Sequence, residues 1–359
     1  MLWMLAAILI CGASVFTACS SNDDNPFQPV VQVGIDKTNF PDDNFWNYLL
    51  EQDYGKDGVL TAAEIRNITV MDVSEKEIKS LKGIEYFTAL RTLNCSDNEL
   101  TELDISGNTA LDTLDCSYNE LTALDVSKNT ALRSLDCGFN ELTSLDLSVN
   151  KALTELSCDD NKLTSLDISV NKALTELSCS GNKLTSLDVS KNTALTRLSC
   201  DDNKLTALDI SVNTALTSLS CDDNKLTALD ISKNTALTRL YCGFNELTSL
   251  DISKNTALTY LYCGFNELTS LDLSKNMALE KLLCFKNQIS GQNMDALIGS
   301  LRQNESEEFC VFYVMDGNEP NQNVCTKSQA AAAKAKGWLP QYWDEDEEVW
   351  LEYEGSASS

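Results

Sequence analysis

The chain has 359 residues, of which 43% are apolar and 23% are charged, so it can bury a substantial core. Its formal net charge of -27 argues against nucleic acid as a partner, because a polyanion would be repelled. The chain contains no histidine, which removes the commonest general base and every Ser-His or Cys-His nucleophile pair. The sequence therefore favours a non-enzymatic protein that requires no cofactor.

The N-terminal segment, residues 1–18, is apolar and ends in small residues, as a secretory signal peptide does. Residues 16–19 (Phe-Thr-Ala-Cys) resemble a bacterial lipobox, which implies cleavage before Cys19 and lipidation of that cysteine. Residues 20–24 (Ser-Ser-Asn-Asp-Asp) resemble the acidic signal that sends Bacteroidota lipoproteins to the outer face of the outer membrane. We therefore expect a lipid-anchored surface protein with a linker at 19–39; the alternatives are a plain secretory signal and an uncleaved anchor.

Residues 40–67 are predicted to form a helical N-terminal cap with similarity to an EF-hand. Residues 53–64 place acidic groups at loop positions 1, 5 and 12 and glycine at position 6, as in a calcium-binding loop. The candidate calcium ligands are Asp53, Asp57, Val59, Thr61 and Glu64. Position 3 is Gly55, which has no side-chain oxygen. The alternative interpretation is that Thr61 and Glu64 form a capping box that starts the next helix.

A unit of 21 residues recurs from Leu90 onward, with cysteine at ten successive equivalent positions and asparagine three residues after each cysteine. The ladder cysteines are Cys95, Cys116, Cys137, Cys158, Cys179, Cys200, Cys221, Cys242, Cys263 and Cys284. The pattern Leu-x-x-Leu-x-Cys-x-x-Asn-x-Leu is typical of leucine-rich repeats, in which each turn contributes one short parallel strand. Residues 68–290 are therefore predicted to form an α/β repeat solenoid with a parallel sheet on its concave face.

The leucine, cysteine and asparagine columns have separate structural roles in this prediction. Leucine and cysteine side chains should point into the core, and the asparagine amides should satisfy backbone groups where the chain leaves each strand. The cysteines could instead form a metal array or a disulfide ladder. Closely spaced pairs such as Cys-x-x-Cys, which zinc sites use, are absent. Strands in register hold their side chains parallel, which does not fit the torsion angle of a disulfide. Reduced and buried thiols are therefore favoured.

Residues 291–359 are predicted to form a small α/β cap, because an open last turn would expose its apolar interior. We expect a helix at 293–301, a strand at 309–315, an alanine-rich helix after Thr326, and a terminal hairpin. The strands of the hairpin are expected at 338–343 and 349–353. Two cysteines of this segment lie outside the ladder and are the one plausible pair for a disulfide, and they are Cys310 and Cys325.

The cysteine-asparagine repeat resembles that of the cysteine-ladder internalins, which are Listeria surface proteins, and that of repeat proteins of Bacteroidota. The resemblance covers the chain from about residue 40 to about residue 354. It implies a leucine-rich-repeat surface protein whose N-terminal cap resembles an EF-hand pair without needing calcium. The fold itself does not define the ligand, since it hosts many partners.

Aromatic side chains gather in the turns near the C-terminal end, at positions that alternate with the inward-facing residues of the strands. Exposed aromatic clusters mark binding sites for proteins or sugar rings. The alternative is that some of these rings lie under the C-terminal cap. The predicted ligand-binding residues are Tyr241, Phe244, Tyr260, Tyr262, Phe265 and Phe285.

These features together predict a monomeric, surface-exposed lipoprotein of the outer membrane that contacts the membrane only through its lipid. It would act as an adhesion or binding module that engages a host or neighbouring-cell protein or glycan through the concave face. The alternative is a structural or spacer component of the cell envelope without a dedicated ligand.

Overall fold

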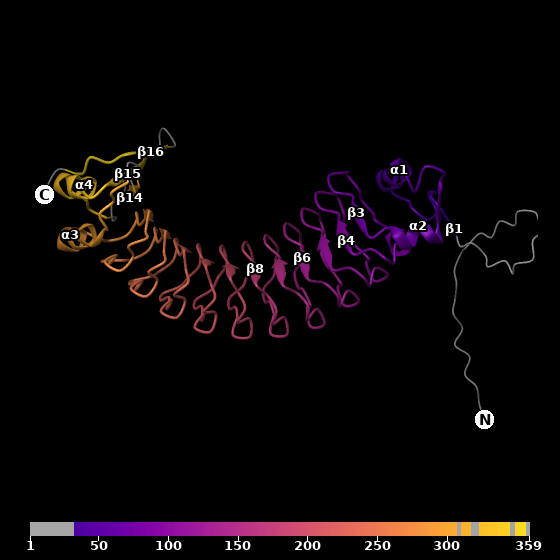
Figure 1. Ribbon diagram of the computed structural model, residues 1–359, viewed down its shortest axis with the longest axis horizontal. Coiled ribbons are helices and arrows are strands. Elements are labelled where there is room, and N and C mark those ends of the chain that lie inside the picture. Colours follow the sequence, from indigo (N-terminus) through magenta and orange to yellow (C-terminus); the bar gives the residue numbers. More distant parts are fainter. Residues whose placement is uncertain (1–31, 307–309, 317–322, 345–348, 357–359) are drawn as a thin grey trace, which may run out of the picture. The chain divides into compact units, whose positions relative to one another are not determined.

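The computed structural model describes residues 32–306, 310–316, 323–344 and 349–356. Within these residues, the strands stack side by side into one 14-stranded sheet that runs in sequence order from β3 to β16. Figure 1 shows the successive turns of this stack, with α1 and α2 beside β3, and α3 and α4 beside β14 and β15. No helix in the described part of the chain is long and apolar enough to cross a membrane.

Each repeat contributes one strand of three residues, paired in parallel with the strands of the turns before and after it. Leu93 pairs with Leu114, and Leu114 pairs with Leu135, so equivalent residues of adjacent turns lie side by side. The strands are β3 Val70–Asp72, β4 Thr92–Asn94, β5 Thr113–Asp115, β6 Ser134–Asp136, β7 Glu155–Ser157, β8 Glu176–Ser178, β9 Arg197–Ser199, β10 Ser218–Ser220, β11 Arg239–Tyr241, β12 Tyr260–Tyr262 and β13 Lys281–Leu283. This confirms the predicted parallel-sheet solenoid with 21-residue turns.

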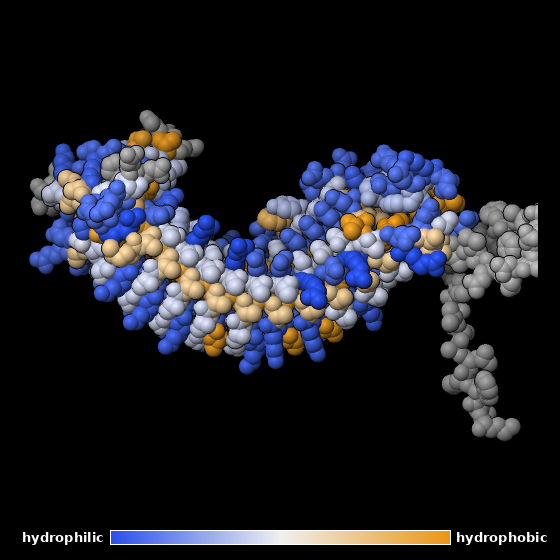
Figure 2. Space-filling model, viewed as in Figure 1, coloured by the Kyte–Doolittle hydropathy of each residue, from blue (hydrophilic) through white to orange (hydrophobic). Residues whose placement is uncertain are grey.

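The core lies between the strands and the return segments and consists of the predicted leucine and cysteine columns. In the turn at β8, Leu177 is 2% exposed and Cys179 is fully buried. Stacking supplies most of this burial, because one turn alone would leave its leucines in contact with water on both sides. Figure 2 shows the same regularity at the surface, where a row of mildly hydrophobic residues runs along the stack between hydrophilic ones.

The asparagine column ties each turn to the next, as the sequence predicts. The Asn140 Nδ2 donates to the carbonyl oxygens of Cys116 and Cys137 at 3.0 and 3.2 Å, and to that of Gly138 at 3.0 Å. Its Oδ1 accepts from the Leu121 backbone N–H at 2.9 Å. One buried side chain therefore satisfies four backbone groups from two turns, and the arrangement repeats along the stack.

A second asparagine column, on the return side, was not assigned a role from the sequence. Asn150 is fully buried, and its Nδ2 donates to the carbonyl oxygens of Val126 and Asn129 at 3.1 and 2.9 Å. Its Oδ1 has no hydrogen-bond partner among the residues that the structure describes. This column fastens the return segments of adjacent turns together, as Asn140 and its equivalents do beside the sheet.

The ladder cysteines are free, buried thiols, which confirms the packing interpretation over a disulfide ladder. The Cys137 Sγ lies 3.5 Å from the Ser157 carbonyl oxygen of the next turn, where it can act as a weak donor. Burial raises the pKa of the Cys137 thiol, so it stays protonated and unreactive. No group of three or more cysteine or acidic side chains in the described residues is placed to hold a metal ion.

The N-terminal cap begins earlier than the sequence predicts. Part of the expected linker forms β1 Gln32–Gly34, which pairs antiparallel with β2 Val59–Thr61. The helices α1 Asp43–Glu51 and α2 Ala62–Asn67 follow, and a 3-10 turn at Ile84–Tyr86 lies beyond them. Burial of Phe45 and Leu49 against the first turns explains why this segment closes the open end of the core.

The C-terminal cap contains the elements that the sequence predicts. These are α3 Gly291–Ser300, β14 Cys310–Asp316, α4 Lys327–Ala335, β15 Trp338–Asp344 and β16 Val349–Glu352. The hairpin is confirmed, because β15 pairs antiparallel with β16. A capping box formed by Thr326 and Gln329 starts α4. Unlike the expectation of a separate cap, β14 and β15 extend the repeat sheet as two further parallel strands.

This cap contains one more turn of the ladder, whose sequence pattern is interrupted by an insertion. The Asn323 Nδ2 donates to the carbonyl oxygens of Cys284 and Val314 at 2.7 and 3.0 Å, and its Oδ1 accepts from the Ile289 N–H at 2.9 Å. These are the bonds of a ladder asparagine, with Val314 in the place of the ladder cysteine. Nine residues separate Val314 from Asn323 instead of three, which is why the repeat pattern alone did not find it.

The predicted disulfide between Cys310 and Cys325 is not formed, because both residues are free thiols. The Cys310 Sγ accepts from the Arg302 guanidinium at 3.1 Å. Cys325 follows Asn323 at the spacing at which leucine follows asparagine in the repeats, and it is fully buried. Cys325 therefore takes a leucine position in the core of the concealed turn.

Thiol titration tests the ladder directly. We expect the folded, never-reduced protein to react slowly with a thiol reagent, because burial keeps the ladder thiols protonated and covered. After unfolding in denaturant, all ten ladder cysteines should react within the mixing time. A count near zero in the unfolded protein would mean that the column is oxidised, and the packing account would be wrong.

Candidate ligand-binding surface

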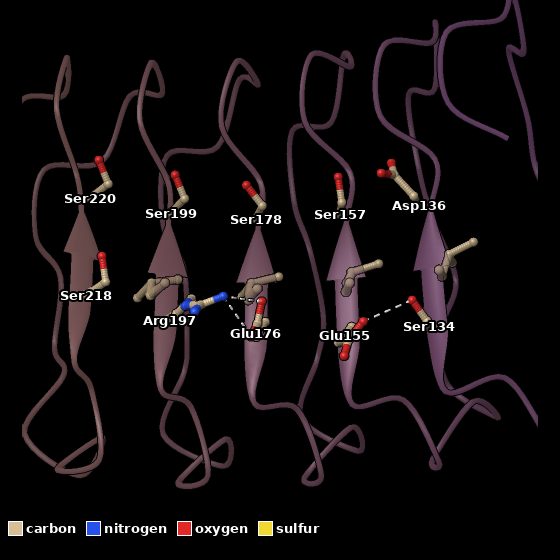
Figure 3. Close-up of a pocket in the computed structure, with 14 residues that line it drawn as sticks. Ser134, Asp136, Glu155, Ser157, Glu176, Ser178, Arg197, Ser199, Ser218 and Ser220 are labelled. Carbon is tan, nitrogen blue, oxygen red and sulfur yellow. Dashed lines mark hydrogen bonds and ion pairs between the residues drawn. The ribbon is translucent and has the colours of Figure 1, made fainter. Parts of the chain in front are cut away.

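The sheet face is hollowed across the strands β6 to β10, where a cavity of about 380 Å³ opens on the middle turns. Figure 3 shows that serine side chains line one edge of this floor at the strand ends. The opposite edge carries an ion pair, in which the Arg197 Nη1 lies 3.1 Å from the Glu176 Oε1, and a hydrogen bond that the Ser134 Oγ donates to the Glu155 carboxylate at 3.2 Å. The floor is therefore polar and offers both donors and acceptors.

A line of carboxylates leads from this floor towards the C-terminal turns. The Asp201 Oδ1 accepts from the Asp222 backbone N–H at 2.8 Å, and the Asp222 Oδ1 accepts from the Gly243 N–H at 2.5 Å. Burial, together with the nearby negative charge of Asp201, raises the pKa of Asp222 to about 7. This carboxyl therefore changes its charge near neutral pH at the border of the aromatic turns.

The predicted aromatic residues come together in the structure. The rings of Phe244 and Phe265 stack with their centroids 3.9 Å apart, and those of Tyr241 and Tyr260 lie 4.8 Å apart. Tyr262 joins the two pairs, since it pairs with Tyr241 in the sheet and its ring centroid lies 6.3 Å from that of Phe244. The same ring lies 5.9 Å from that of Phe285. We refer to the five members Tyr241, Phe244, Tyr260, Tyr262 and Phe265 as the aromatic cluster.

Phe285, the sixth predicted binding residue, belongs to the cap and not to the surface. It is only 6% exposed, and its ring lies 5.2 Å from that of Trp350 in β16. The prediction was therefore wrong for this residue, and the alternative of a ring under the C-terminal cap holds for it. The sequence could not reveal this, because the position of Trp350 depends on how the hairpin folds back over the last repeats.

The accessible part of the cluster is also smaller than the sequence suggests. Tyr262 is partly buried, because its ring lies across two glycines: a Cβ on Gly243 would stand 2.7 Å from the ring, and one on Gly264 would stand 2.9 Å from it. Phe244 remains 44% exposed. We therefore regard Phe244 as the cluster member that a ligand can reach most easily.

Two further residues complete the cluster and were missed by sequence reasoning. The Lys281 ammonium group lies 5.3 Å from the ring centroid of Tyr260 and 5.2 Å from that of Tyr313, so it is held between two aromatic faces. Tyr313 pairs with Leu283 in the sheet, which extends the tyrosine positions of β11 and β12 into β14. The chain from Cys284 to Val314 spans 30 residues instead of 21, because α3 lies between β13 and β14, so counting from the ladder did not place Tyr313.

The rings of Phe244 and Phe265 are attached to unusual backbone. Their φ angles are 47° and 51°, in the left-handed region that bulky side chains avoid at a cost of roughly 1 to 2 kcal/mol. The equivalent position holds Gly181 or aspartate in the middle turns, which are residue types that tolerate this conformation. The chain thus places large rings, with Phe244 exposed and Phe265 partly buried, where the fold alone would favour small or polar residues.

The structure shows a second pair of the same kind near the N-terminal end. Tyr118 and Phe139 have φ angles of 52° and 53°, and their rings stack at a centroid distance of 4.1 Å with an angle of 7°. They are 53% and 42% exposed. The signal was present in the sequence, because both residues stand two positions after a ladder cysteine, as Phe244 and Phe265 do.

The candidate calcium loop has a different arrangement from a cation site. The Glu64 Oε2 accepts from the Thr61 backbone N–H at 2.7 Å, and the Thr61 Oγ1 accepts from the Glu64 N–H at 3.2 Å. This confirms the capping-box alternative. Asp53 pairs with Lys56 at 2.5 Å, and the Asp57 Oδ1 accepts from the Val59 N–H at 3.1 Å. As placed, these residues do not converge on a calcium ion, and calcium binding stays a prediction that would require Glu64 to leave the capping box.

Comparison with known proteins places this architecture among the leucine-rich-repeat solenoids. No protein-family model and no curated protein matches the chain. The functional domain of InlJ from Listeria monocytogenes, which includes a cysteine ladder, is 28% identical, with a TM-score of 0.54 over 92% of this chain and 94% of that domain. An internalin (InlF) from the same species is 22% identical, with a TM-score of 0.68 over 86% of this chain and 97% of the other.

A leucine-rich-repeat protein of Leptospira interrogans is likewise 22% identical, with a TM-score of 0.62 over 78% of both chains. The protein is therefore a leucine-rich-repeat solenoid. Its structural neighbours include internalins, one of which has a cysteine ladder.

Proposed function

We propose that the protein is a non-enzymatic binding or adhesion module that engages a protein or a glycan through the concave face of its repeats. The observation that carries this proposal is the exposure of aromatic rings on left-handed backbone beside a hollowed polar floor. Strain of this kind persists where a function requires it, because folding alone would select against it. The internalin-like neighbours support a role in binding or adhesion.

We further propose that the module is displayed on the outer membrane of a bacterium through a lipid on Cys19. This residue lies outside the residues that the structure describes. The proposal rests on the similarity of residues 16–19 to a lipobox and on the acidic residues that follow. Such an anchor would hold the repeats at the cell surface, where a protein or glycan of a host or neighbouring cell can reach them.

The aromatic cluster provides the test of binding. We expect the double variant Tyr241→Ala with Phe244→Asn to stay folded, because neither side chain lies in the core and asparagine tolerates the backbone at residue 244. Affinity should fall on the order of 1000-fold if both rings contribute about 2 kcal/mol each, and about 30-fold if only one of them does. The measurement is binding of purified wild type and variant to immobilised host-surface proteins and glycans.

Val212→Ala is the matched control, because Val212 is an apolar side chain that is 43% exposed. It lies on the return segment between β9 and β10 and so away from the aromatic cluster. It should leave binding unchanged. Equal binding by the double variant and the wild type would refute the proposed site and favour an envelope spacer without a dedicated ligand. Unfolding of the C-terminal turns in the double variant would instead show that the rings are structural.

Surface display is tested separately through the proposed lipid anchor. Cells that express the wild type should incorporate labelled palmitate into the protein, and added protease should remove it from intact cells. Cys19→Ala should abolish the labelling and release the protein from the membrane fraction, because no acyl chain would remain to hold it. Unchanged processing and membrane association in Cys19→Ala would contradict the lipoprotein proposal.

A further inference from the structure

The residue two positions after each ladder cysteine occupies one recurring place on the surface. At every repeat it takes a left-handed conformation, just beyond the end of the strand. From the first repeat to the last, this column reads Asp97, Tyr118, Phe139, Asp160, Gly181, Asp202, Asp223, Phe244, Phe265 and Lys286. We call it the rim column. Two pairs of stacked rings interrupt an otherwise small or charged series, one pair towards each end.

The two pairs have the same geometry and a defined separation. The rings of Tyr118 and Phe139 stack at 4.1 Å, and those of Phe244 and Phe265 stack at 3.9 Å. Phe139 and Phe244 are 105 residues apart, which is five turns of 21. At about 4.8 Å per strand, the facing rings stand on the order of 24 Å apart along the stack. A single extended partner can span that distance and touch both pairs.

The position two residues after the rim column differs in charge between the ring turns and the turns that separate the two pairs. In each ring turn the residue two positions after the ring is an exposed glutamate, and these residues are Glu120, Glu141, Glu246 and Glu267. In the four turns between the pairs, the same position holds lysine, and these residues are Lys162, Lys183, Lys204 and Lys225. Carboxylates therefore accompany the rings, although Glu141 also forms an ion pair with Lys162 at the boundary.

A stacked ring pair in turns that carry exposed glutamates two residues further along the chain is suited to a guanidinium or ammonium group. The face of an aromatic ring attracts a cation through its quadrupole, and the carboxylates add direct ion pairing. The net charge of -27 would also draw a basic partner towards this surface from a distance. A neutral sugar could stack on the rings, but it would gain nothing from the charge of the glutamates.

We propose that the two ring pairs are twin anchor points for one protein partner that presents two groups of arginine or lysine side chains about 24 Å apart. This proposal rests on the proposed binding function and adds the chemistry and spacing of the partner. It also gives the pair Tyr118 and Phe139, at the far end of the repeats from the aromatic cluster, a role in the same contact.

The test uses two synthetic peptides and the full chain. The two-ended probe carries three arginines at each end of a 20-residue Gly-Ser linker, whose root-mean-square length is about 25 Å. The one-ended probe has serines in place of one arginine group. We expect the wild type to bind the two-ended probe at least 10-fold more tightly than the one-ended probe, because the second contact is intramolecular.

Three double variants locate the contacts. Tyr118→Asn with Phe139→Asn should reduce the affinity for the two-ended probe to that for the one-ended probe, and so should Phe244→Asn with Phe265→Asn. Glu246→Gln with Glu267→Gln should have the same effect while leaving both rings in place, so the test does not depend on the ring variants remaining folded.

The matched control is Asp202→Asn with Asp223→Asn, which removes two exposed charges from the rim column between the pairs. It should change the affinity less than threefold. The proposal is overturned if the ring variants bind the two-ended probe as tightly as the wild type does, or if the control loses as much affinity as they do. If the wild type binds chitohexaose and neither arginine probe, the cationic protein partner is wrong while the binding function survives.

Discussion

The asparagine amide that joins adjacent turns is the interaction on which the rest of this structure depends. Each ladder asparagine donates to carbonyl groups of its own turn and of the preceding one, and accepts an N–H from the return path, as Asn140 does with Cys116, Cys137 and Leu121. These groups are buried and would otherwise be unsatisfied. The interaction therefore holds the period at 21 residues and keeps the strands in register, because a shift of one residue would break every such bond.

Regular turns make the surface a set of straight columns, and this has a functional consequence. A position that is left-handed in one turn is left-handed in all of them, so residue type along the rim column can be compared at constant backbone geometry. Aspartate and glycine tolerate this left-handed backbone in the middle turns, whereas the same backbone is strained at Phe139 and Phe244. The stacked turns below them supply the stability that tolerates this strain, and the rings themselves remain accessible to a partner.

Most of the fold could be predicted because it is repeated: the ladder pattern, the buried thiols and the capping elements are each encoded locally. The errors fall where the repeat ends. Phe285 is covered by Trp350 from a distant hairpin, and Cys325 fills a leucine position that an insertion had displaced from the pattern. The pair of Tyr118 and Phe139 was visible in the sequence, but its importance depends on the left-handed backbone and the ring stacking, which only the coordinates reveal.

The central claim is that the exposed rings serve binding and do not serve folding. It is tested most directly by the urea unfolding midpoint of the variant Tyr118→Asn with Phe139→Asn. Stacking of the two rings contributes about 0.5 to 1.5 kcal/mol, while release of left-handed strain returns roughly 1 to 2 kcal/mol per residue. The account predicts a midpoint equal to or above that of the wild type. A loss of more than about 2 kcal/mol of stability would contradict it, because a cost of that size belongs to side chains that hold the fold together.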